Sequence, residues 1–265
     1  MPDLVSGISN PDTVRAQYAT AQNLSARISI HSKYSVNKQG FGPWITAHYP
    51  AAPSMRVLEL GCGTGDMWAG NGAYIEACAQ FVLSDFSEGM LEKAKENIKD
   101  IPGIEYRVID IMDIPFPADS FDLVIANMML YHVPDLAKGL SEVRRVLKKG
   151  GEFFCATYGE NGMMTYIAQM FSEYKVENKA NDRFTLQNGQ AVLRPYFTEV
   201  ERLDYPDALD VTDMEDMADY IESLSGFSAL RALPRSVILR VLEENCSGGV
   251  LHIPKEYGMF IAKQY

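Results

Sequence analysis

The feature that most constrains this chain of 265 residues is an apolar run that leads directly into three closely spaced glycines. Residues 56–65 read RVLELGCGTG, with Gly61, Gly63 and Gly65 at alternate positions. The apolar run predicts a β-strand. The glycines predict a tight turn in which a ligand can approach main-chain N–H groups without meeting a Cβ atom. The segment therefore predicts a strand followed by a ligand-binding loop.

The glycine spacing and one acidic residue narrow the choice of ligand. A dinucleotide-binding loop has the spacing G-x-G-x-x-G, whereas the third glycine of this loop comes one residue earlier. Glu59 lies two positions before Gly61, where a carboxylate would repel a pyrophosphate. The same carboxylate can hold the ammonium of an amino acid, directly or through water. A nucleoside joined to an amino acid therefore fits the loop better than NAD.

Acidic residues also end the next two expected strands. Asp85 follows the run FVLS and can accept both hydroxyls of a ribose, although an isolated aspartate in this place is also typical of a turn or helix cap. Asp110 follows YRVI and can accept the exocyclic amine of adenine, while the main-chain N–H of Ile111 can reach a ring nitrogen. Open α/β sheets bind ligands at the carboxyl ends of their strands, so these residues are expected to share one site.

Apolar runs alternate with helical patterns between residues 55 and 158. We expect strands at 56–60, 81–84, 104–109, 121–126 and 151–157, and helices near 71–78, 89–97 and 136–147. Such alternation predicts a parallel sheet built from βαβ units. Gly150 and Gly151 are expected to end the helix at 136–147, with Lys148 and Lys149 in its final turn. Later segments predict helices at 162–177, 213–224 and 234–244, and strands at 200–205 and 258–263 that complete the sheet.

Four segments, in this order, resemble one enzyme family. They are LELGCGTG, DFSEGMLEKAKEN, DIMDIPFPADSFDLVIANMMLYHVPD and EVRRVLKKGGEFF, which lie between residues 55 and 158. Together they resemble the class I S-adenosylmethionine-dependent methyltransferases, especially the group that includes enzymes of ubiquinone and menaquinone biosynthesis. The resemblance implies a Rossmann-like, doubly wound α/β fold with a mostly parallel seven-stranded sheet, an N-terminal helical lid and helical insertions after the fifth strand.

The resemblance also implies a domain organisation and a cofactor. Residues 1–50 would form the lid, and residues 51–265 the methyltransferase domain, with a cofactor core at 55–158 and the last two strands plus a helical substrate cap at 159–265. The cofactor would be S-adenosylmethionine, and the product S-adenosylhomocysteine. Its methionine, ribose and adenine parts would contact these residues: Glu59, Gly61, Gly63, Gly65 and the main chain of Asn127 (methionine); Asp85 with Phe86 and Met90 packing nearby (ribose); Asp110 and Ile111 (adenine).

The acceptor side of the site is less constrained by sequence. Tyr18, Arg27, His31 and Tyr34 are spaced so that several can share one helical face, although a surface helix that docks through its aromatic residues has the same spacing. His132 is the first candidate for a general base, because it follows the fourth strand and the ordinary pKa of histidine is near neutral; a structural role is equally consistent. His31 and Tyr34 are further catalytic candidates. Trp68 and Tyr131 are candidates for the substrate pocket, and Trp68 is equally consistent with simple packing.

The charge balance disfavours several kinds of partner. The chain has 24 Lys and Arg residues against 35 Asp and Glu residues, a net charge of −11. Nucleic-acid binders normally present a basic face, and no run reaches the roughly 18 apolar residues of a membrane span. We therefore expect neither nucleic acid nor a membrane as a partner. The chain begins without the features of a signal peptide, and its four cysteines form no CxxC pair, so a cytoplasmic protein is expected.

These observations predict an S-adenosylmethionine-dependent methyltransferase that acts on a nitrogen or oxygen nucleophile of a small molecule by in-line displacement, although no residue excludes carbon. No cluster of histidines and acids has the spacing of metal ligands, so no metal is expected. Two alternatives remain: a non-catalytic protein that binds the nucleoside for regulation, and a nicotinamide-dependent oxidoreductase, which the glycine spacing disfavours. The sequence does not determine the oligomeric state.

Overall fold

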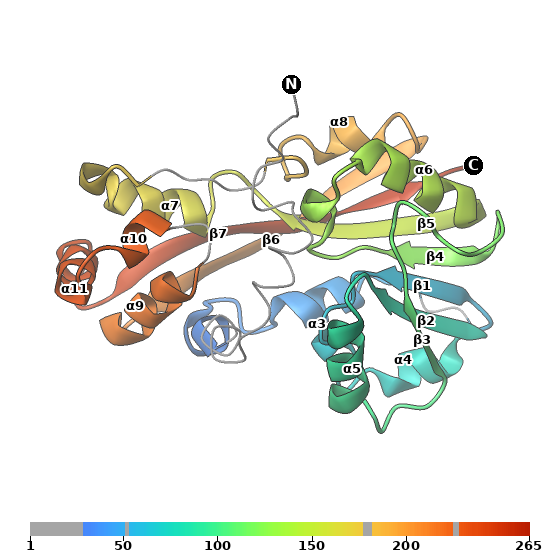
Figure 1. Ribbon diagram of the computed structural model, residues 1–265, viewed down its shortest axis with the longest axis horizontal. Helices are drawn as coiled ribbons and strands as arrows, with labels where there is room; N and C mark the ends of the chain where they lie inside the picture. The colour runs from blue at the N-terminus through green and yellow to red at the C-terminus, as the bar shows by residue number, and fades with distance from the viewer. Residues whose placement is uncertain (1–28, 51–52, 177–181, 225–227) are drawn as a thin grey trace. The chain divides into compact units, whose positions relative to one another are not determined.

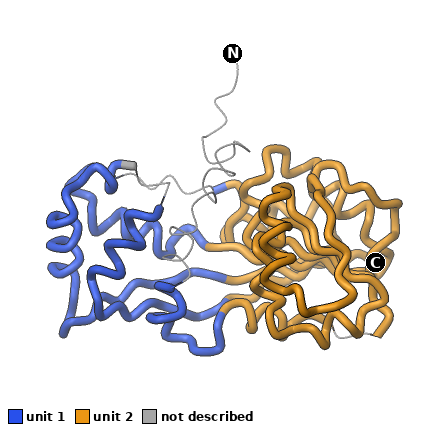
Figure 2. Tube along the Cα trace, turned by 60° about the horizontal axis from the view of Figure 1, so that its bottom comes forward, with its two compact units in different colours: residues 1–40, 159–182, 205–257 blue, residues 41–158, 183–204, 258–265 orange. Residues whose placement is uncertain are grey.

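The computed structural model describes residues 29–50, 53–176, 182–224 and 228–265 (Figure 1). The chain divides into two compact units, shown in separate colours in Figure 2. Unit 1 comprises residues 1–40, 159–182 and 205–257, and unit 2 comprises residues 41–158, 183–204 and 258–265. Each unit is built from three separate stretches of chain, so neither corresponds to one continuous domain in the sequence.

A seven-stranded sheet has the strand order β3-β2-β1-β4-β5-β7-β6. Its strands are β1 (Arg56–Leu60), β2 (Gln80–Asp85), β3 (Ile104–Val108), β4 (Phe121–Ile125), β5 (Leu147–Tyr158), β6 (Glu199–Val211) and β7 (Leu251–Lys263). Strands β1 to β5 pair in parallel, and the sheet ends in an antiparallel hairpin of β6 and β7. The order reverses at β1, from which the chain builds outward in both directions, as in doubly wound folds. The predicted Rossmann-like sheet is therefore confirmed.

Alternate residues along the strands of unit 2 pack into two separate cores, because successive side chains of a strand point to opposite faces. Leu58 of β1 lies in one core with Leu140 and Val143. Val57 lies in the other core with Ile75 and Ala94. Both faces of the sheet are thus covered, which explains why these strands read as continuous apolar runs rather than as alternating ones.

The three helices expected between residues 55 and 158 lie close to their predicted positions, as α4 (Gly72–Ala77), α5 (Glu88–Asn97) and α6 (Leu136–Val146). The other described helices of unit 2 are α3 (Phe41–Thr46), η1 (Asp66–Trp68), η2 (Leu130–His132) and α8 (Gly189–Leu193). Helix α6 begins at a defined cap, where the side chain of Asp135 accepts a hydrogen bond from the main-chain N–H of Lys138. Its apolar stripe includes Leu140 and Val143, so amphipathicity and capping together set its position.

Unit 1 has its own apolar core, built mainly from helices. Residues 29–34 are helical, and the further helices are α7 (Met163–Met170), η3 (Ser172–Tyr174), α9 (Met214–Ser223), α10 (Ser228–Arg231) and α11 (Arg235–Glu244). Ile30, Ile167, Ile221 and Ile238 are buried together in this core, with Leu209 of β6.

The prediction that Gly150 and Gly151 end a helix is wrong. Helix α6 ends at Val146, and Lys148, Lys149 and both glycines belong to β5. The pairing of β4 with β5 shifts register between Phe121/Leu147 and Leu123/Glu152, and Gly150 has a φ of +78° there. The glycines therefore accommodate an irregularity inside a strand rather than a helix cap. The ammonium of Lys148 donates to both carboxylate oxygens of Asp122 in β4, each at 2.8 Å. It therefore pairs with a strand residue and not, as predicted from the sequence, with the end of a helix.

The last two strands are longer than predicted. We expected strands only at 200–205 and 258–263, whereas β6 and β7 each extend over 13 residues. Pro206 explains part of the difference for β6, since proline normally ends a strand. Strand β6 lies at the edge of the sheet, where a missing N–H removes no hydrogen bond from the ladder.

Candidate functional site

The loop after β1 is a left-handed glycine turn joined to the end of β2. Gly61, Gly63 and Gly65 have φ values of +72°, +57° and +71°, a region that disfavours other residues. The N–H of Gly63 donates to Oδ2 of Asp85 at 2.9 Å, and the N–H of Cys62 donates to the carbonyl of Ser84 at 2.9 Å.

The surroundings of the three glycines differ. A Cβ at Gly61 would lie 2.9 Å from Cγ of Met129, and one at Gly65 would lie 3.2 Å from Cβ of Ala94. At Gly63, a Cβ would have no heavy atom of the described residues within 4 Å. Packing therefore disfavours a side chain at Gly61, whereas at Gly65 a Cβ would be in tight contact with Ala94. Gly63 faces open space, as a backbone position that a ligand approaches would.

Asp85 holds the glycine loop and the start of the next helix in place. Its Oδ2 accepts from Gly63, and its Oδ1 accepts from the N–H of Ser87 at 2.8 Å, directly before α5. Burial raises the pKa of Asp85, and these main-chain hydrogen bonds oppose the rise. The structural role that the sequence left open is therefore present. Its contact with a ribose stays a prediction.

Glu59 is buried beside the glycine loop, with only 3% of its surface exposed. One of its carboxylate oxygens accepts a hydrogen bond from the indole N–H of Trp68, and its main-chain carbonyl accepts from the hydroxyl of Ser84 at 2.6 Å. Burial raises the pKa of Glu59 to about 7, the hydrogen bond from Trp68 opposes this rise, and the nearby Asp85 adds to it. The group is therefore poised to titrate near neutral pH.

Trp68, which donates to Glu59, is buried in the core. It is 1% exposed, and its ring lies 4.7 Å from that of Phe81 in an edge-to-face contact and 6.0 Å from that of Tyr49 in a stacked one. Of the two roles that the sequence allowed, these contacts describe packing, with the added function of a hydrogen bond to Glu59.

The segment after β3 turns back on itself at Asp110. The Oδ1 of Asp110 accepts from the N–H of Met112 at 2.8 Å, and its carbonyl accepts from the N–H of Asp113 at 2.9 Å. The N–H of Ile109 donates to the carbonyl of Asp85 at 3.1 Å, which joins this segment to the end of β2. The side chain of Ile111 is buried at 6% exposure against Gly139. Their contact with adenine stays a prediction.

Asn127 lies at the carboxyl end of β4, where its side chain continues the pairing with β5. Its Oδ1 accepts from the N–H of Ala156 at 3.1 Å, and the N–H of Met128 donates to the carbonyl of Ala156 at 2.8 Å. Its Nδ2 donates to the hydroxyl of Tyr49 at 2.7 Å. Met128 has a φ of +54°, which is unusual for a residue other than glycine. The carboxyl ends of β1, β2, β3 and β4 thus meet through Gly61, Asp85 and Asn127 and their neighbours.

Four other candidates lie in unit 2 close to these strand ends in the sequence. Phe86 is 45% exposed directly after β2, and Met90 is half-buried in α5. Tyr131 and His132 lie in η2, with ring centroids 4.5 Å apart, and Tyr131 also packs against Tyr158 at 4.7 Å. The N–H of His132 donates to the carbonyl of Met129 at 2.9 Å, which fixes the turn that carries the imidazole.

Two catalytic candidates, His31 and Tyr34, belong to unit 1 and are described with respect to that unit. The hydroxyl of Tyr34 donates to Oδ2 of Asp216 at 2.6 Å, and burial together with this bond raises the pKa of Tyr34 to about 12. Burial and the adjacent cation of Lys255 lower the pKa of His31 to about 4. Both groups are thus neutral near pH 7, and neither is tuned for proton transfer there. Tyr18 and Arg27 lie outside the described residues.

Lys255 belongs to a buried polar cluster in unit 1. Its ammonium donates to Oδ2 of Asp207 and to the hydroxyl of Ser35, and the Lys255 and Asp207 side chains are 3% and 1% exposed. The other oxygen of Asp207 accepts from the N–H groups of Asn37 and Ala208. Burial alone would raise the pKa of Asp207, but these hydrogen bonds and the ammonium hold it below its ordinary value.

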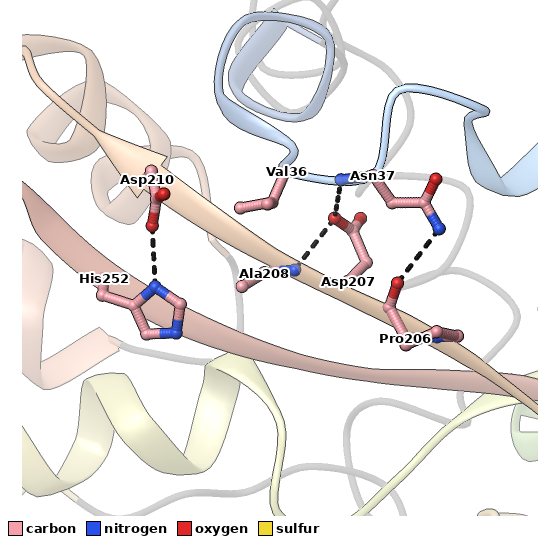
Figure 3. Close-up of a pocket in the computed structure, with 7 residues that line it drawn as sticks. All are labelled: Val36, Asn37, Pro206, Asp207, Ala208, Asp210 and His252. Atoms are coloured by element: carbon pink, nitrogen blue, oxygen red, sulfur yellow. Dashed lines mark hydrogen bonds and ion pairs between the residues drawn. The ribbon is translucent and has the colours of Figure 1, made fainter.

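A groove of about 320 Å³ lies on unit 1 beside this cluster (Figure 3). Its lining residues are Val36, Asn37, Pro206, Asp207, Ala208, Asp210 and His252. Its polar side chains bind one another or the main chain; His252, for example, contacts Asp210 at 2.7 Å. The groove therefore offers a poorer set of ligand-binding groups than the strand ends of unit 2.

Tyr49 is the residue of the candidate site that sequence reasoning missed. It is 6% exposed and lies three residues after α3. Its hydroxyl bonds to a residue 78 positions later in the chain, so no local spacing signals the contact.

Neither a metal-binding group nor a membrane-spanning helix is present in the described part of the chain. No group of three or more His, Cys, Asp and Glu side chains there is arranged to hold a metal ion. No helix there has both the length and the apolar character needed to cross a membrane.

Residues 58–155 match the family described as a methyltransferase domain. A demethylmenaquinone methyltransferase of Symbiobacterium thermophilum is 32% identical over 165 residues, which are 60% of this chain and 66% of that protein. A ubiquinone/menaquinone biosynthesis C-methyltransferase of Vibrio vulnificus is 31% identical over 113 residues, which are 42% of this chain and 44% of that protein. The chain thus spans at most 66% of the length of these two relatives.

A solved structure supports the fold. Haemonchus contortus phosphoethanolamine N-methyltransferase 2 in complex with S-adenosyl-L-methionine has a TM-score of 0.58 at 20% identity, with 94% of this chain and 58% of that chain covered. The sequence matches and the fold are consistent with a ligand site at the strand ends of unit 2. The chain belongs to the class I S-adenosylmethionine-dependent methyltransferase family.

Proposed function

We propose that this chain is an enzyme that transfers a methyl group from S-adenosylmethionine to a small molecule by in-line displacement. The observation that carries the proposal is the joined set of strand ends in unit 2. There the open face of Gly63 lies on a loop held by Asp85, with the buried carboxyl of Glu59 beside it. These groups suit a ligand that has a ribose at one end and an amino acid at the other.

Each residue then has a role that follows from its chemistry. The carboxylate of Glu59 attracts the ammonium of the methionine part, and the N–H groups of the glycine loop allow close approach. The carboxylate of Asp85 accepts hydroxyls of the ribose, with Phe86 and Met90 packing nearby, and the segment at Asp110 and Ile111 binds adenine. When bound, the cofactor supplies a methyl group already activated by the positive charge on sulfur. The main task of the protein is therefore to align donor and acceptor.

For the acceptor, we propose the residues and segments that the sequence predicts. His132 is the first candidate to remove a proton from the acceptor, because it follows β4 at the same end of the sheet. The expected lid spans residues 1–50, of which residues 1–28 lie outside those that the structure describes, and residues 159–265 would contribute a substrate cap. The proposal also keeps a cytoplasmic location and excludes nucleic acid and membranes as partners.

The nucleophile in this proposal is nitrogen or oxygen. Carbon is the alternative, since one relative is named a C-methyltransferase and another a demethylmenaquinone methyltransferase. NMR of a product made with ¹³C-methyl donor separates these outcomes, because the chemical shift of the new methyl group differs for each bonded atom.

The test combines binding with turnover. Calorimetry with S-adenosylhomocysteine and with NAD should detect binding of the first ligand alone. Incubation with tritiated methyl donor and a panel of amines, phenols and quinols should then label at least one acceptor, and Asp85→Ala should abolish labelling. Binding without transfer to any acceptor would favour the non-catalytic alternative, and preferential binding of NAD would favour an oxidoreductase.

A further inference from the structure

The hydrogen bonds of the Asn127 side chain define the orientation of its amide. Its oxygen faces the main-chain N–H of Ala156, which is a donor and cannot accept. Its NH₂ group must therefore face Tyr49, whose hydroxyl oxygen accepts at 2.7 Å. A weaker contact of the same nitrogen reaches the sulfur of Met67 at 3.6 Å. The amide is thus held at both ends, by β5 on one side and by Tyr49 on the other.

This restraint lies next to an unfavourable backbone conformation. Met128, directly after Asn127, has a φ of +54°. A non-glycine residue keeps such a conformation only where its surroundings enforce it, at a cost of about 1–3 kcal/mol. The bonds of Asn127 and Met128 to Ala156 supply part of the restraint, and the hydroxyl of Tyr49 supplies the remaining fixed contact of the amide.

The ring of Tyr49 is anchored independently of its hydroxyl. It packs edge-on against Phe154 at 5.2 Å and stacks on Trp68 at 6.0 Å. Its pKa is raised well above the ordinary value by burial and by the nearby Glu59, so the hydroxyl keeps its proton. A phenylalanine at this position would keep the ring contacts and lose only the hydrogen bond to Asn127.

We propose that Tyr49 is a positioning residue of the cofactor site, whose hydroxyl holds the Asn127 amide and thereby keeps the end of β4 in the conformation that binds the methionine part of the cofactor. This rests on the proposed function, because it assigns Tyr49 to the same strand ends. It adds a segment that precedes β1 to the parts of the chain that determine cofactor affinity.

The test compares Tyr49→Phe with Tyr74→Phe. Tyr74 belongs to the same aromatic cluster, with its ring 6.2 Å from that of Tyr49, but its hydroxyl donates to the carbonyl of Pro50 at 3.0 Å and not to a strand end. We expect Tyr49→Phe to raise the Kd for S-adenosylhomocysteine about three- to tenfold, the effect of one lost hydrogen bond. Tyr74→Phe should change the Kd less than twofold, with similar melting temperatures for both variants.

A double-mutant cycle shows whether the hydroxyl acts through Asn127. In an Asn127→Ala background, Tyr49→Phe should change the Kd less than twofold, because the partner of the hydroxyl is gone. An undiminished effect in that background would overturn the proposal, since the hydroxyl would then act by another route. If Asn127→Ala does not fold, the comparison of the two phenylalanine variants still decides: equal Kd values for both overturn the proposal.

The same measurements separate this inference from the function on which it rests. Wild-type protein that binds neither S-adenosylmethionine nor S-adenosylhomocysteine would overturn both. Wild-type protein that binds, together with a Tyr49→Phe variant of unchanged affinity, would overturn only the role of Tyr49.

Discussion

The indole N–H of Trp68 donates a hydrogen bond to the carboxyl group of Glu59 inside the core of unit 2. Trp68 lies just after the glycine loop and Glu59 just before it, so this bond connects the two ends of the loop. A carboxyl group in such an apolar setting resists ionisation, which is why the pKa of Glu59 rises to about 7 despite the hydrogen bond.

The raised pKa of Glu59 predicts a pH-dependent cost in stability. Between about pH 4.5 and pH 7 the folded protein keeps a proton on Glu59 that the unfolded chain releases, so this group lowers the free energy of unfolding as pH rises. Glu59→Gln removes that loss. We expect the variant to gain up to about 3 kcal/mol on wild type between pH 5 and pH 8, measured by guanidinium denaturation at both values.

The control for this measurement is Glu92→Gln, which removes an exposed carboxylate paired with Lys95. Its difference from wild type should be nearly the same at both pH values. A Glu59→Gln variant that behaves like this control would show that Glu59 ionises normally in the folded protein.

The glycine loop predicts different effects for alanine at two positions. Gly61→Ala combines a positive φ with a Cβ placed 2.9 Å from Met129, so it should lower the free energy of unfolding by about 2–4 kcal/mol. Gly63→Ala should cost only about 1–2 kcal/mol of stability, because its Cβ enters open space. In the proposed site the same Cβ would lie where the cofactor approaches, so the Kd for S-adenosylhomocysteine should rise at least tenfold in calorimetry.

Gly70→Ala separates backbone strain from ligand exclusion. Gly70 has a φ of +85°, and a Cβ there also meets no described atom within 4 Å, but it lies after η1 and outside the glycine loop at residues 61–65. It should match Gly63→Ala in stability and leave the Kd unchanged. Equal affinities for the two variants would contradict the assignment of Gly63 to the ligand site.

The low pKa of His31 predicts that its imidazole stays neutral through the physiological range. Burial and the nearby Lys255 both disfavour the charged form, and together they lower the pKa to about 4. In NMR spectra of histidine-labelled protein, the signal that disappears in His31→Asn should not shift between pH 5.5 and pH 8. A midpoint near 6.5 would show that the ring is exposed to water and would restore His31 as a candidate base.

The buried pair of Lys255 and Asp207 predicts strongly non-additive substitutions. Asp207→Asn leaves a buried ammonium without its counter-charge, so it should lower the free energy of unfolding by about 3–5 kcal/mol. Adding Lys255→Met should recover at least half of that loss. Asp204→Asn, which breaks an exposed pair with Arg202, should cost less than about 1 kcal/mol in the same denaturation experiment. Equal losses for both single variants would indicate that water reaches Lys255.

The parallel core was predictable because its signals are local. Strand β1 was expected at residues 56–60 and has those bounds, since an apolar run ends at glycines that only a turn accommodates. The prediction for Gly150 and Gly151 was wrong because their structure is set by a non-local contact. A glycine pair after a helical pattern is typical of a cap, and only the pairing of β4 with β5 shows that they belong to a strand.

The residues of the candidate site likewise fall into two groups: those that the local sequence signals and those that only the fold reveals. Asp85 and Asp110 could be proposed from the sequence because each follows an apolar run, and Glu59 because it lies two positions before the glycine loop. These are local signals with a position in the sequence. Tyr49 was missed because its importance comes from a contact with Asn127, and only the folded sheet brings those two residues together. Burial likewise cannot be predicted from local sequence, because the shifted pKa values of Glu59 and His31 depend on neighbours that are distant in the chain.

The connectivity of the two units has a practical consequence for engineering. Because each unit is assembled from three stretches, the polypeptide crosses between them five times. No truncation at either terminus can delete one unit and leave the other with its full complement of residues. Exchanging unit 1 for that of a homologue would require coordinated replacement of all three stretches, with two of the splice points inside strands β6 and β7.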